Sequence, residues 1–404
     1  MTVTANRDVP DGLSKADERR AAGVAFGAHA LHDGYTDLIY VMLPIWQAEF
    51  GLGFAALGLL KTVFAGTLAG FQVPAGMLAE RFGAAIVLAL GTALAGLGYC
   101  LAGAGSGIAI LVAALFVGGL GASTQHPLAS SIVARAFAGP RSLWALGAYN
   151  FSGDIGKMTL PAAAALLLVV LPWRQALILL GGFGVLAAVA VFFFLPRLPA
   201  AAVAPPPAKA AAPGGRGLRR YGFPLLLAVG VIDSATRMAF LTFLPFVLTA
   251  KGASLPTVGL ALTLVFAGGA AGKLICAFIG ARIGTIATVW LTEIVTAAGI
   301  VALLPLPLDA AMLLLPMVGV ALNGTSSVLY GSVPDLVEPS RHSRAFGIFY
   351  TGTIGAGAVS PALYGLLGDT VGVATTLTVI AGAVLLTLPV TLALRPALAA
   401  ARAA

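Results

Sequence analysis

The amino-acid sequence predicts an all-α membrane protein with twelve transmembrane helices in two six-helix pseudo-symmetric halves. Composition is the first observation: 59% of the 404 residues are hydrophobic and 9% are charged, with a mean hydropathy of +0.99, far outside the range of soluble domains. The second is the recurrence of apolar runs long enough to cross roughly 30 Å of hydrocarbon as helices. These runs are continuous rather than alternating, which excludes a β-barrel. The third is an internal repeat, described below.

Breaks made by Gly, Pro and charged residues define the expected spans in order along the chain. In the first half, residues 21–195, we expect spans at 21–48, 55–79, 84–104, 107–135, 142–171 and 174–195. In the second half, residues 221–395, we expect spans at 221–249, 256–281, 285–304, 309–334, 343–367 and 371–394. Residues 196–220 are basic and rich in Pro, Ala and Gly, which predicts a flexible cytoplasmic linker. Residues 1–20, too polar for a signal peptide, and residues 396–404 are expected to be cytoplasmic tails.

The two halves repeat each other at an offset of about 200 residues. MLAERFG at Met77–Gly83 corresponds to FIGARIG at Phe278–Gly284, and Leu43–Pro44 corresponds to Leu244–Pro245. The turn at Pro140–Arg141 likewise has a counterpart at residues 339–340. Duplication of six helices is typical of secondary transporters, in which the substrate lies near the midplane between the halves.

Lysine and arginine predict how the chain sits in the membrane. Most of those between the expected spans fall on the side that holds both termini and the linker, and only Arg174 and Lys251 fall on the other. Both termini are therefore expected in the cytoplasm, with the chain in the cell inner membrane. The same asymmetry accounts for the net charge of +8, so we expect no nucleic-acid partner. Cys100 and Cys276 fall in apolar spans and are expected to be free thiols.

Ionisable residues inside the expected spans are candidate functional residues. A charge at the bilayer centre costs about 2.5–3.5 kcal/mol on insertion scales, so such groups face a partner, water or a substrate pathway. In the first span, the stretch HALHDGYTDLIY places four of them on one broad helix face: His29, His32, Asp33 and Asp37. The seventh span has Asp233 and Arg237 at the equivalent positions, and the remaining candidates are Lys61, Asp154, Lys157, Lys273 and Glu293.

Several partners are open for these residues. Asp37 and Arg237 could pair across a cavity between the halves. Asp154 and Lys157 are three positions apart and could pair with each other or contact the substrate. Lys61 could extend to the membrane interface or face the cavity, whereas Lys273 lies deeper. Glu293 could pair with any of these cations.

The histidines allow a metal interpretation, because imidazole and carboxylate groups suit zinc and similar ions. The candidates are His29, His32, Asp33 and His126. Histidines that pack between helices are commoner than histidines that bind metal, so we expect no resident metal and no cofactor. If a metal is transported, a chelated form would suit a cavity of mixed charge better than a bare ion. Burial and a neighbouring cation act on a carboxyl group in opposite senses, and histidine titrates near neutral pH. Asp33, Asp37 and His29 are therefore the candidates for proton coupling.

The motif GMLAERFG at Gly76–Gly83 resembles the loop signature of the major facilitator superfamily, written G-x-L-a-D-R-x-G, with Glu80 in place of the commoner Asp. In that family the acidic residue and the arginine hold the cytoplasmic ends of helices in one conformation and release them in the other. The resemblance therefore implies that Glu80 and Arg81 are gate residues, together with Gly76 and Gly83.

A narrower resemblance covers most of the first half. The motifs are His29-x-x-x-Asp33, Leu43–Pro44, Gly58–Leu59, Q-x-P at Gln72–Pro74, QHPLASS at Gln125–Ser131 and NFSGDIG at Asn150–Gly156. They are similar to the fosmidomycin-resistance branch of the superfamily, which implies proton-driven efflux of drugs or metabolites, drug resistance and action as a monomer. This chain departs from the branch at Lys157, where proline is frequent.

The sequence thus predicts a proton-coupled exporter of a small anionic or zwitterionic compound that works by alternating access, with protons, substrate and bilayer as its partners. The cations Arg237, Lys157, Lys61 and Lys273 favour a substrate with negative charge. The other expected substrate-binding residues are His32, Tyr35, Asp37, His126, Asn150, Asp154 and Asp233. An importer or exchanger of an organic acid and an exporter of a metal-chelating metabolite are alternatives. An enzyme is not expected, because the sequence has no G-x-S-x-G, H-E-x-x-H, phosphate-loop or CxxC motif.

Overall fold

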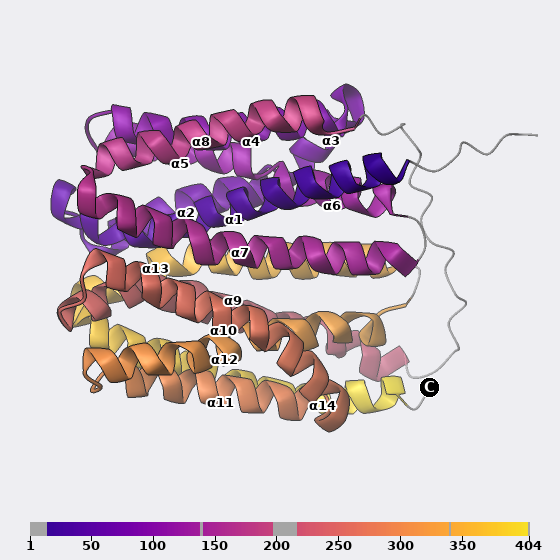
Figure 1. The fold of residues 1–404 in the computed structure, drawn as a ribbon. Coiled ribbons are helices and arrows are strands. Elements are labelled where there is room, and N and C mark those ends of the chain that lie inside the picture. Colours follow the sequence, from indigo (N-terminus) through magenta and orange to yellow (C-terminus); the bar gives the residue numbers. More distant parts are fainter. Residues whose placement is uncertain (1–13, 138–139, 197–215, 339–340, 403–404) are drawn as a thin grey trace, which may run out of the picture.

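The computed structural model describes residues 14–137, 140–196, 216–338 and 341–402, and the regular secondary structure of these residues is entirely helical. The helices run roughly parallel to one another in two bundles that lie side by side (Figure 1). The first residues of α1 and the last of α14 lie on one side of the molecule, which we call the termini side, and the opposite side is the far side (Figure 1).

The first bundle comprises α1 to α8 and the second α9 to α14. The first consists of α1 (Lys15–Phe50), α2 (Phe54–Gly70), α3 (Gln72–Phe82), α4 (Ala84–Ala104), α5 (Ile108–Ala122), α6 (Gln125–Ala136), α7 (Pro140–Val170) and α8 (Trp173–Phe194). The second consists of α9 (Arg216–Ala250), α10 (Leu255–Ile283), α11 (Thr285–Leu303), α12 (Leu308–Leu336), α13 (His342–Val384) and α14 (Thr387–Arg402).

These helices correspond to the twelve expected spans. α2 and α3 form one span bent by 43°, and α5 with α6 forms another. α13 contains a break at Gly372, whose φ of 80° is left-handed, so the chain reverses there and the rest of α13 joins α14 as the twelfth span. The arrangement of six spans in each bundle confirms the predicted fold class.

Length and hydropathy alone identify fewer spans. Within the described residues they select nine helices, or ten if α2 and α3 are taken as one span. One of the nine is the 57-residue stretch Arg344–Ala400, which would be about 86 Å long if straight and therefore crosses roughly 30 Å of hydrocarbon twice. α1 is not selected, and it is the helix that contains His29, His32, Asp33 and Asp37.

Some helices extend beyond the expected spans. α1 begins at Lys15 rather than near Ala21, because the Ser14 hydroxyl accepts a hydrogen bond from the Asp17 N–H at 3.1 Å and caps the helix. α14 continues to Arg402, so much of the expected C-terminal tail is helical. Of the expected linker, residues 197–215 lie outside the described residues and 216–220 belong to α9. Residues 1–13, 138–139 and 339–340 also lie outside them. Of the two expected turns, Pro140–Arg141 instead begins α7, and 339–340 is not among the described residues.

The repeat is visible in backbone conformation. Gly83 ends α3 with φ 89°, and Gly284 ends α10 with φ 84°. Only glycine adopts this left-handed conformation without strain. The MLAERFG and FIGARIG motifs therefore form the same helix-ending turn in both halves.

Cys100 and Cys276 are free, as predicted.

The halves meet mainly where α2 packs against α13 and α7 against α10, and α1 also contacts α9 and α10. On the far side the contact is close. A Cβ on Gly58 of α2 would overlap the backbone of Pro361 in α13, and small residues permit such an approach. The Asp369 carboxylate of α13 accepts hydrogen bonds from the N–H groups of Phe54 and Ala55, at 2.5 and 3.0 Å, at the start of α2.

The apolar core is shared on the far side and divided on the termini side. One cluster joins both halves and includes Trp46, Phe64, Phe240 and Phe243. A second belongs to the first half and runs from Ala21 to Leu195, and a third belongs to the second half and runs from Leu226 to Leu398. Their members lie at the termini-side ends of the helices, so the bundles are joined on the far side and packed separately on the termini side.

Candidate functional site

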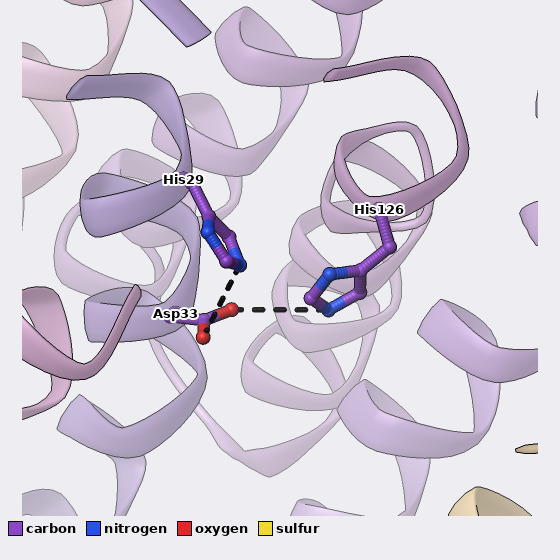
Figure 2. A group of neighbouring side chains, drawn as sticks. All are labelled: His29, Asp33 and His126. Atoms are coloured by element: carbon purple, nitrogen blue, oxygen red, sulfur yellow. Dashed lines mark ion pairs between the residues drawn. The ribbon is translucent and has the colours of Figure 1, made fainter. Parts of the chain in front are cut away.

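Asp33 is the centre of a cluster of charged and polar groups halfway along α1. Its side chain is 10% exposed, and its carboxylate lies 3.2 Å from Lys157 Nζ of α7, 3.5 Å from His29 Nε2 and 3.8 Å from His126 Nε2 of α6. Figure 2 shows the carboxylate between the two imidazole rings. Three expected site residues from separate helices are thus brought to one carboxylate.

His29 is held in place by Tyr149 of α7. The imidazole stacks on the tyrosine ring, with centroids 4.0 Å apart, and Nδ1 lies 2.7 Å from the Tyr149 carbonyl oxygen. A carbonyl oxygen only accepts hydrogen bonds, so Nδ1 carries a proton and Nε2 faces Asp33. Sequence reasoning missed Tyr149, since its role depends on a backbone carbonyl and ring stacking, for which no sequence motif exists.

Asp33, His29 and His126 have the residue types and the proximity of a metal site. Their potential ligand atoms all lie within 4.8 Å of one another, and a carbonyl that orients a histidine is common around metals. Against this, the Lys157 ammonium occupies the same carboxylate, and a divalent cation would have to displace it. The contacts favour an ion-pair cluster, and we assign no metal to it.

Two further ion pairs lie in the same central region. Lys61 Nζ is 3.8 Å from Asp37 and donates to the Thr36 carbonyl at 2.5 Å, and the lysine side chain is 2% exposed. Lys273 of α10 lies 2.7 Å from both carboxylate oxygens of Asp154 in α7, which links the two halves. The possible pairing of Asp154 with Lys157 is therefore not observed, because each has a partner on another helix.

Arg237 differs from these lysines. Among the described residues, no carboxylate oxygen lies within ion-pair distance of its guanidinium, and its buried Nε has no hydrogen-bond partner. The suggested pairing of Asp37 with Arg237 was wrong, because Lys61 is the nearer cation to Asp37. Arg237 remains within electrostatic range of Asp37, Asp233 and Glu293.

Glu293 also lacks a cation among the described residues. We expected it to pair with a lysine or arginine, but the acid Asp233 is within its electrostatic range, and its Oε1 is buried without a hydrogen-bond partner. Asp233 and Glu293 are 4% and 1% exposed. The sequence identified both as intramembrane acids, but they belong to α9 and α11, 60 positions apart, and their proximity has no sequence signal.

The remaining expected residues have varied locations. Tyr35 donates to the Leu180 carbonyl at 2.5 Å and His32 lies 3.0 Å from Thr92 Oγ1, so both point into the first half. Asn150 is exposed on α7. The termini-side residues Glu80 and Arg81 are exposed at the end of α3, and within the described part of the chain neither forms an ion pair.

A recess of about 450 Å³ lies elsewhere, at the far-side ends of α1, α9 and the start of α10. Its lining includes Glu49 and Thr249 but none of the central charged residues. The central cluster is instead reached through side chains that keep exposed surface: 29% for Lys157, 36% for Lys273 and 42% for His126.

Sequence comparison identifies the family and two relatives. The family description "Major Facilitator Superfamily" matches residues 25–232 and 226–403. Over 141 residues the chain is 34% identical to the fosmidomycin resistance protein of Escherichia coli (strain K12), covering 34% of each protein. Over 140 residues it is 28% identical to the probable sulfoacetate transporter SauU of Cupriavidus necator, covering 35% of this chain and 33% of the relative. The matches thus span about a third of each relative.

Solved structures give the same fold. A bacterial homolog of the human lysosomal transporter Spinster, in its inward-facing and unoccupied conformation, has a TM-score of 0.73 at 16% identity and covers 96% of this chain and 98% of its own. Its inward-facing and occupied conformation gives 0.73 at 15% identity, covering 97% of both chains. The family match over nearly the whole chain and the duplicated six-helix bundles lead to one conclusion: this chain belongs to the major facilitator superfamily of membrane transporters.

Proposed function

We propose that this transporter exports a small anionic or zwitterionic compound across the inner membrane by alternating access, driven by protons. The observation that carries the proposal is the contrast between the central cations. Lys61, Lys157 and Lys273 each have an aspartate partner, whereas Arg237 has no carboxylate at ion-pair distance among the described residues. A guanidinium binds carboxylate, phosphate or sulfonate oxygens through paired donors, so it is well suited to an anionic group.

The relatives support this substrate class. One is a resistance protein for fosmidomycin and the other a probable transporter of sulfoacetate, a sulfonated carboxylic acid by its name. In the proposed site, Arg237 binds the anionic group, and Lys157, Lys273, His126 and Asn150 are further contacts. Residues that the structure places inside the first half, Tyr35 and His32, would position α1 rather than touch substrate.

The proposed orientation assigns a conformational state. With both termini in the cytoplasm, a molecule joined on the far side and separately packed on the termini side is inward-facing. Glu80 and Arg81 are exposed in this state, in keeping with a cytoplasmic gate that is released. The polar residues of the site would then receive substrate from the cytoplasm, which is the loading step of export.

Proton coupling is proposed at Asp33, with Asp37 and His29 as neighbours. Protonation of Asp33 removes the charge that holds Lys157. The cationic group of a zwitterionic substrate could replace Lys157 beside Asp33, and it would then compete with the proton for this carboxylate. Antiport requires such a linkage, in which substrate and proton exclude each other from one site.

Import of an organic acid is the second candidate, and the Asp33–Lys157 pair at 3.2 Å favours it. An anion that draws Lys157 away would leave Asp33 without its nearest cation and would promote proton uptake. Anion and proton would then bind together and move in the same direction. The two candidates therefore predict opposite signs of linkage between substrate and proton.

Purified protein in proteoliposomes tests the proposal. Counterflow of labelled sulfoacetate and of fosmidomycin is measured first, and then transport under inward and outward pH gradients. We expect Arg237→Ala to lower affinity for the transported anion at least tenfold, Arg237→Lys to restore part of it, and Arg174→Ala, a far-side control paired with Glu49, to behave as wild type. Unchanged affinity in Arg237→Ala would contradict the site. Accumulation with the proton gradient rather than against it would select the importer.

A further inference from the structure

The recess on the far side lies between the two halves, outside the site described above. Its volume of about 450 Å³ falls in the range of small-molecule sites, roughly 300–1,000 Å³. The end of α1 lines it from the first half, and the end of α9 and the start of α10 line it from the second. The lining residues are Pro44, Ile45, Ala48, Glu49, Thr249, Ala253 and Leu255. A ligand in the recess would therefore contact both halves.

The polar side chains of this lining both accept hydrogen bonds. Thr249 Oγ1 donates its proton to the Pro245 carbonyl at 2.8 Å, so its remaining lone pairs can only accept. Glu49 accepts a hydrogen bond from Arg174 Nη2 through Oε1 at 3.0 Å, and its side chain is still 38% exposed. A carboxylate has about four acceptor sites, so Glu49 has acceptors to spare. A ligand that satisfies these atoms must be a donor.

The two cations nearest the recess in sequence are bound elsewhere, and neither lines it. Lys251 Nζ donates to the carbonyl oxygens of Leu304 and Leu306 at 2.7 and 2.6 Å. Arg174 also donates to the Gly105 carbonyl through its other terminal nitrogen. The described lining thus has no side-chain donor for an anionic group, such as the phosphate of a lipid. Its acceptors and its apolar side chains instead match an ammonium group on a compact apolar body.

We propose that the far-side recess binds a small amphipathic amine and that the bound amine inhibits transport. The ammonium donates to Glu49, with Thr249 as a further acceptor, and the apolar body packs on the aliphatic part of the lining. Because the lining comes from both halves, the amine makes all these contacts only while the far side is closed. A ligand that binds one state better shifts the population toward that state. Binding is independent of the proposed substrate, whereas inhibition rests on the alternating access of the proposed function.

Protection of a cysteine in the recess tests binding. The reporter is Ala253→Cys, at a half-buried position, in a background without Cys100 and Cys276, modified by a membrane-impermeant maleimide in detergent. The probe is 2-phenylethylamine, which is protonated at neutral pH like a lysine side chain, and 2-phenylethanol is its neutral counterpart. We expect the amine to slow labelling in a saturable manner and the alcohol to have no effect. No protection by the amine, or equal protection by the alcohol, overturns the proposal.

Three variants locate the ammonium, each judged by the amine concentration that gives half-maximal protection. Glu49→Gln should weaken binding by about tenfold, as expected for the loss of one charge-assisted hydrogen bond. Asp309→Asn, at an exposed acid near the start of α12, should leave it unchanged. Arg174→Gln should strengthen binding, because the competing cation is removed. Weaker binding in Arg174→Gln would overturn direct contact between the ammonium and Glu49.

Labelling of a second cysteine tests inhibition without any substrate. Ala358→Cys, buried in α13, reports on opening of the far side, and we expect 2-phenylethylamine to slow its modification severalfold. Ala48→Phe fills the recess and leaves every charge in place, so it should abolish the effect. Unchanged labelling of Ala358→Cys at a concentration that protects Ala253→Cys overturns the inhibitory role. Failure of sulfoacetate or fosmidomycin to undergo counterflow would contradict the proposed substrates and would not alter these outcomes.

Discussion

At the scale of residues, most charged side chains of the central region lie beside a side chain of opposite charge. Lys61 with Asp37, Lys157 with Asp33, and Lys273 with Asp154 each place a cation beside an anion, as expected where an isolated charge is unfavourable. The exceptions are Arg237, which lacks a carboxylate partner in the described residues, and the acids Asp233 and Glu293, which have no cation at ion-pair distance there. All three lie in the second half.

The Lys61–Asp37 pair gives a stability prediction. Replacing Lys61 by Met leaves the Asp37 carboxylate buried without its nearest cation, and breaking a buried pair in this way costs about 3 kcal/mol or more. We expect Lys61→Met to lower the apparent melting temperature of the detergent-solubilised protein markedly. Adding Asp37→Asn should recover most of the loss, because the uncompensated charge is removed. A double variant as unstable as the single variant would show that packing of the lysine stem matters more than the ion pair.

At the scale of helices, the contacts between the halves explain why the far side is closed. The first N–H groups of a helix have no partner within it, and at α2 two of them donate to Asp369 from the other half. This cap exists only while α2 and α13 are together, so it stabilises the closed far side and must break when that side opens.

Asp369→Ala therefore should favour far-side opening. Loss of a cap is worth about 1 kcal/mol, which corresponds to a roughly fivefold shift in population between two states. The measurement is the rate at which a membrane-impermeant maleimide modifies Ala358→Cys, buried in α13, in a background without Cys100 and Cys276. We expect faster labelling with Asp369→Ala and no change with Asp309→Ala. Equal rates would mean that the cap does not contribute to closure.

Two glycines of α2 allow a matched comparison. A Cβ on Gly58 would overlap the Pro361 backbone, whereas one on Gly66 meets nothing within 4 Å. We expect Gly58→Ala to separate α2 from α13, to speed labelling of Ala358→Cys and to slow counterflow severalfold. Gly66→Ala should leave both unchanged, because alanine is at least as favourable in a helix as glycine. Similar effects at the two positions would indicate a general response of α2 rather than a requirement for close approach.

At the scale of the whole molecule, the apolar core is shared on the far side and divided on the termini side, which is the arrangement expected for one end state of the proposed alternating-access motion. The family uses such motion around a central site, and the cluster at Asp33, the Asp154–Lys273 pair and Arg237 all lie near the midpoints of their helices. Closing the termini side requires the far-side contacts to separate.

Cross-linking the far side should therefore stop transport without blocking binding. Thr62 Oγ1 donates to the Ala358 carbonyl at 2.7 Å between α2 and α13, so cysteines at these two positions are near each other. We expect an oxidised Thr62→Cys, Ala358→Cys protein to bind sulfoacetate yet lose counterflow, and a reductant to restore it. Each single variant is the control. Counterflow that survives complete cross-linking would contradict alternating access through this interface.

The sequence by itself determined the fold class, the duplication and the residues that bear charge inside the membrane. Apolar runs of membrane-spanning length and matched motifs at Met77–Gly83 and Phe278–Gly284 depend only on local sequence, so they can be read without coordinates. The helix that failed the hydropathy criterion, α1, was still recognised, because its polar residues recur at helical spacing.

The tertiary structure determined which ionisable residues lie next to each other. Lys157 lies three positions from Asp154 but pairs with Asp33, and Glu293 lies in electrostatic range of Asp233, without a cation at ion-pair distance among the described residues. Sequence spacing specifies neighbours within a helix, whereas these contacts depend on how helices distant in sequence rotate and approach. The physical reason is that a buried charge is stabilised by whichever group packing brings within a few ångströms, and that is a property of the assembled bundle.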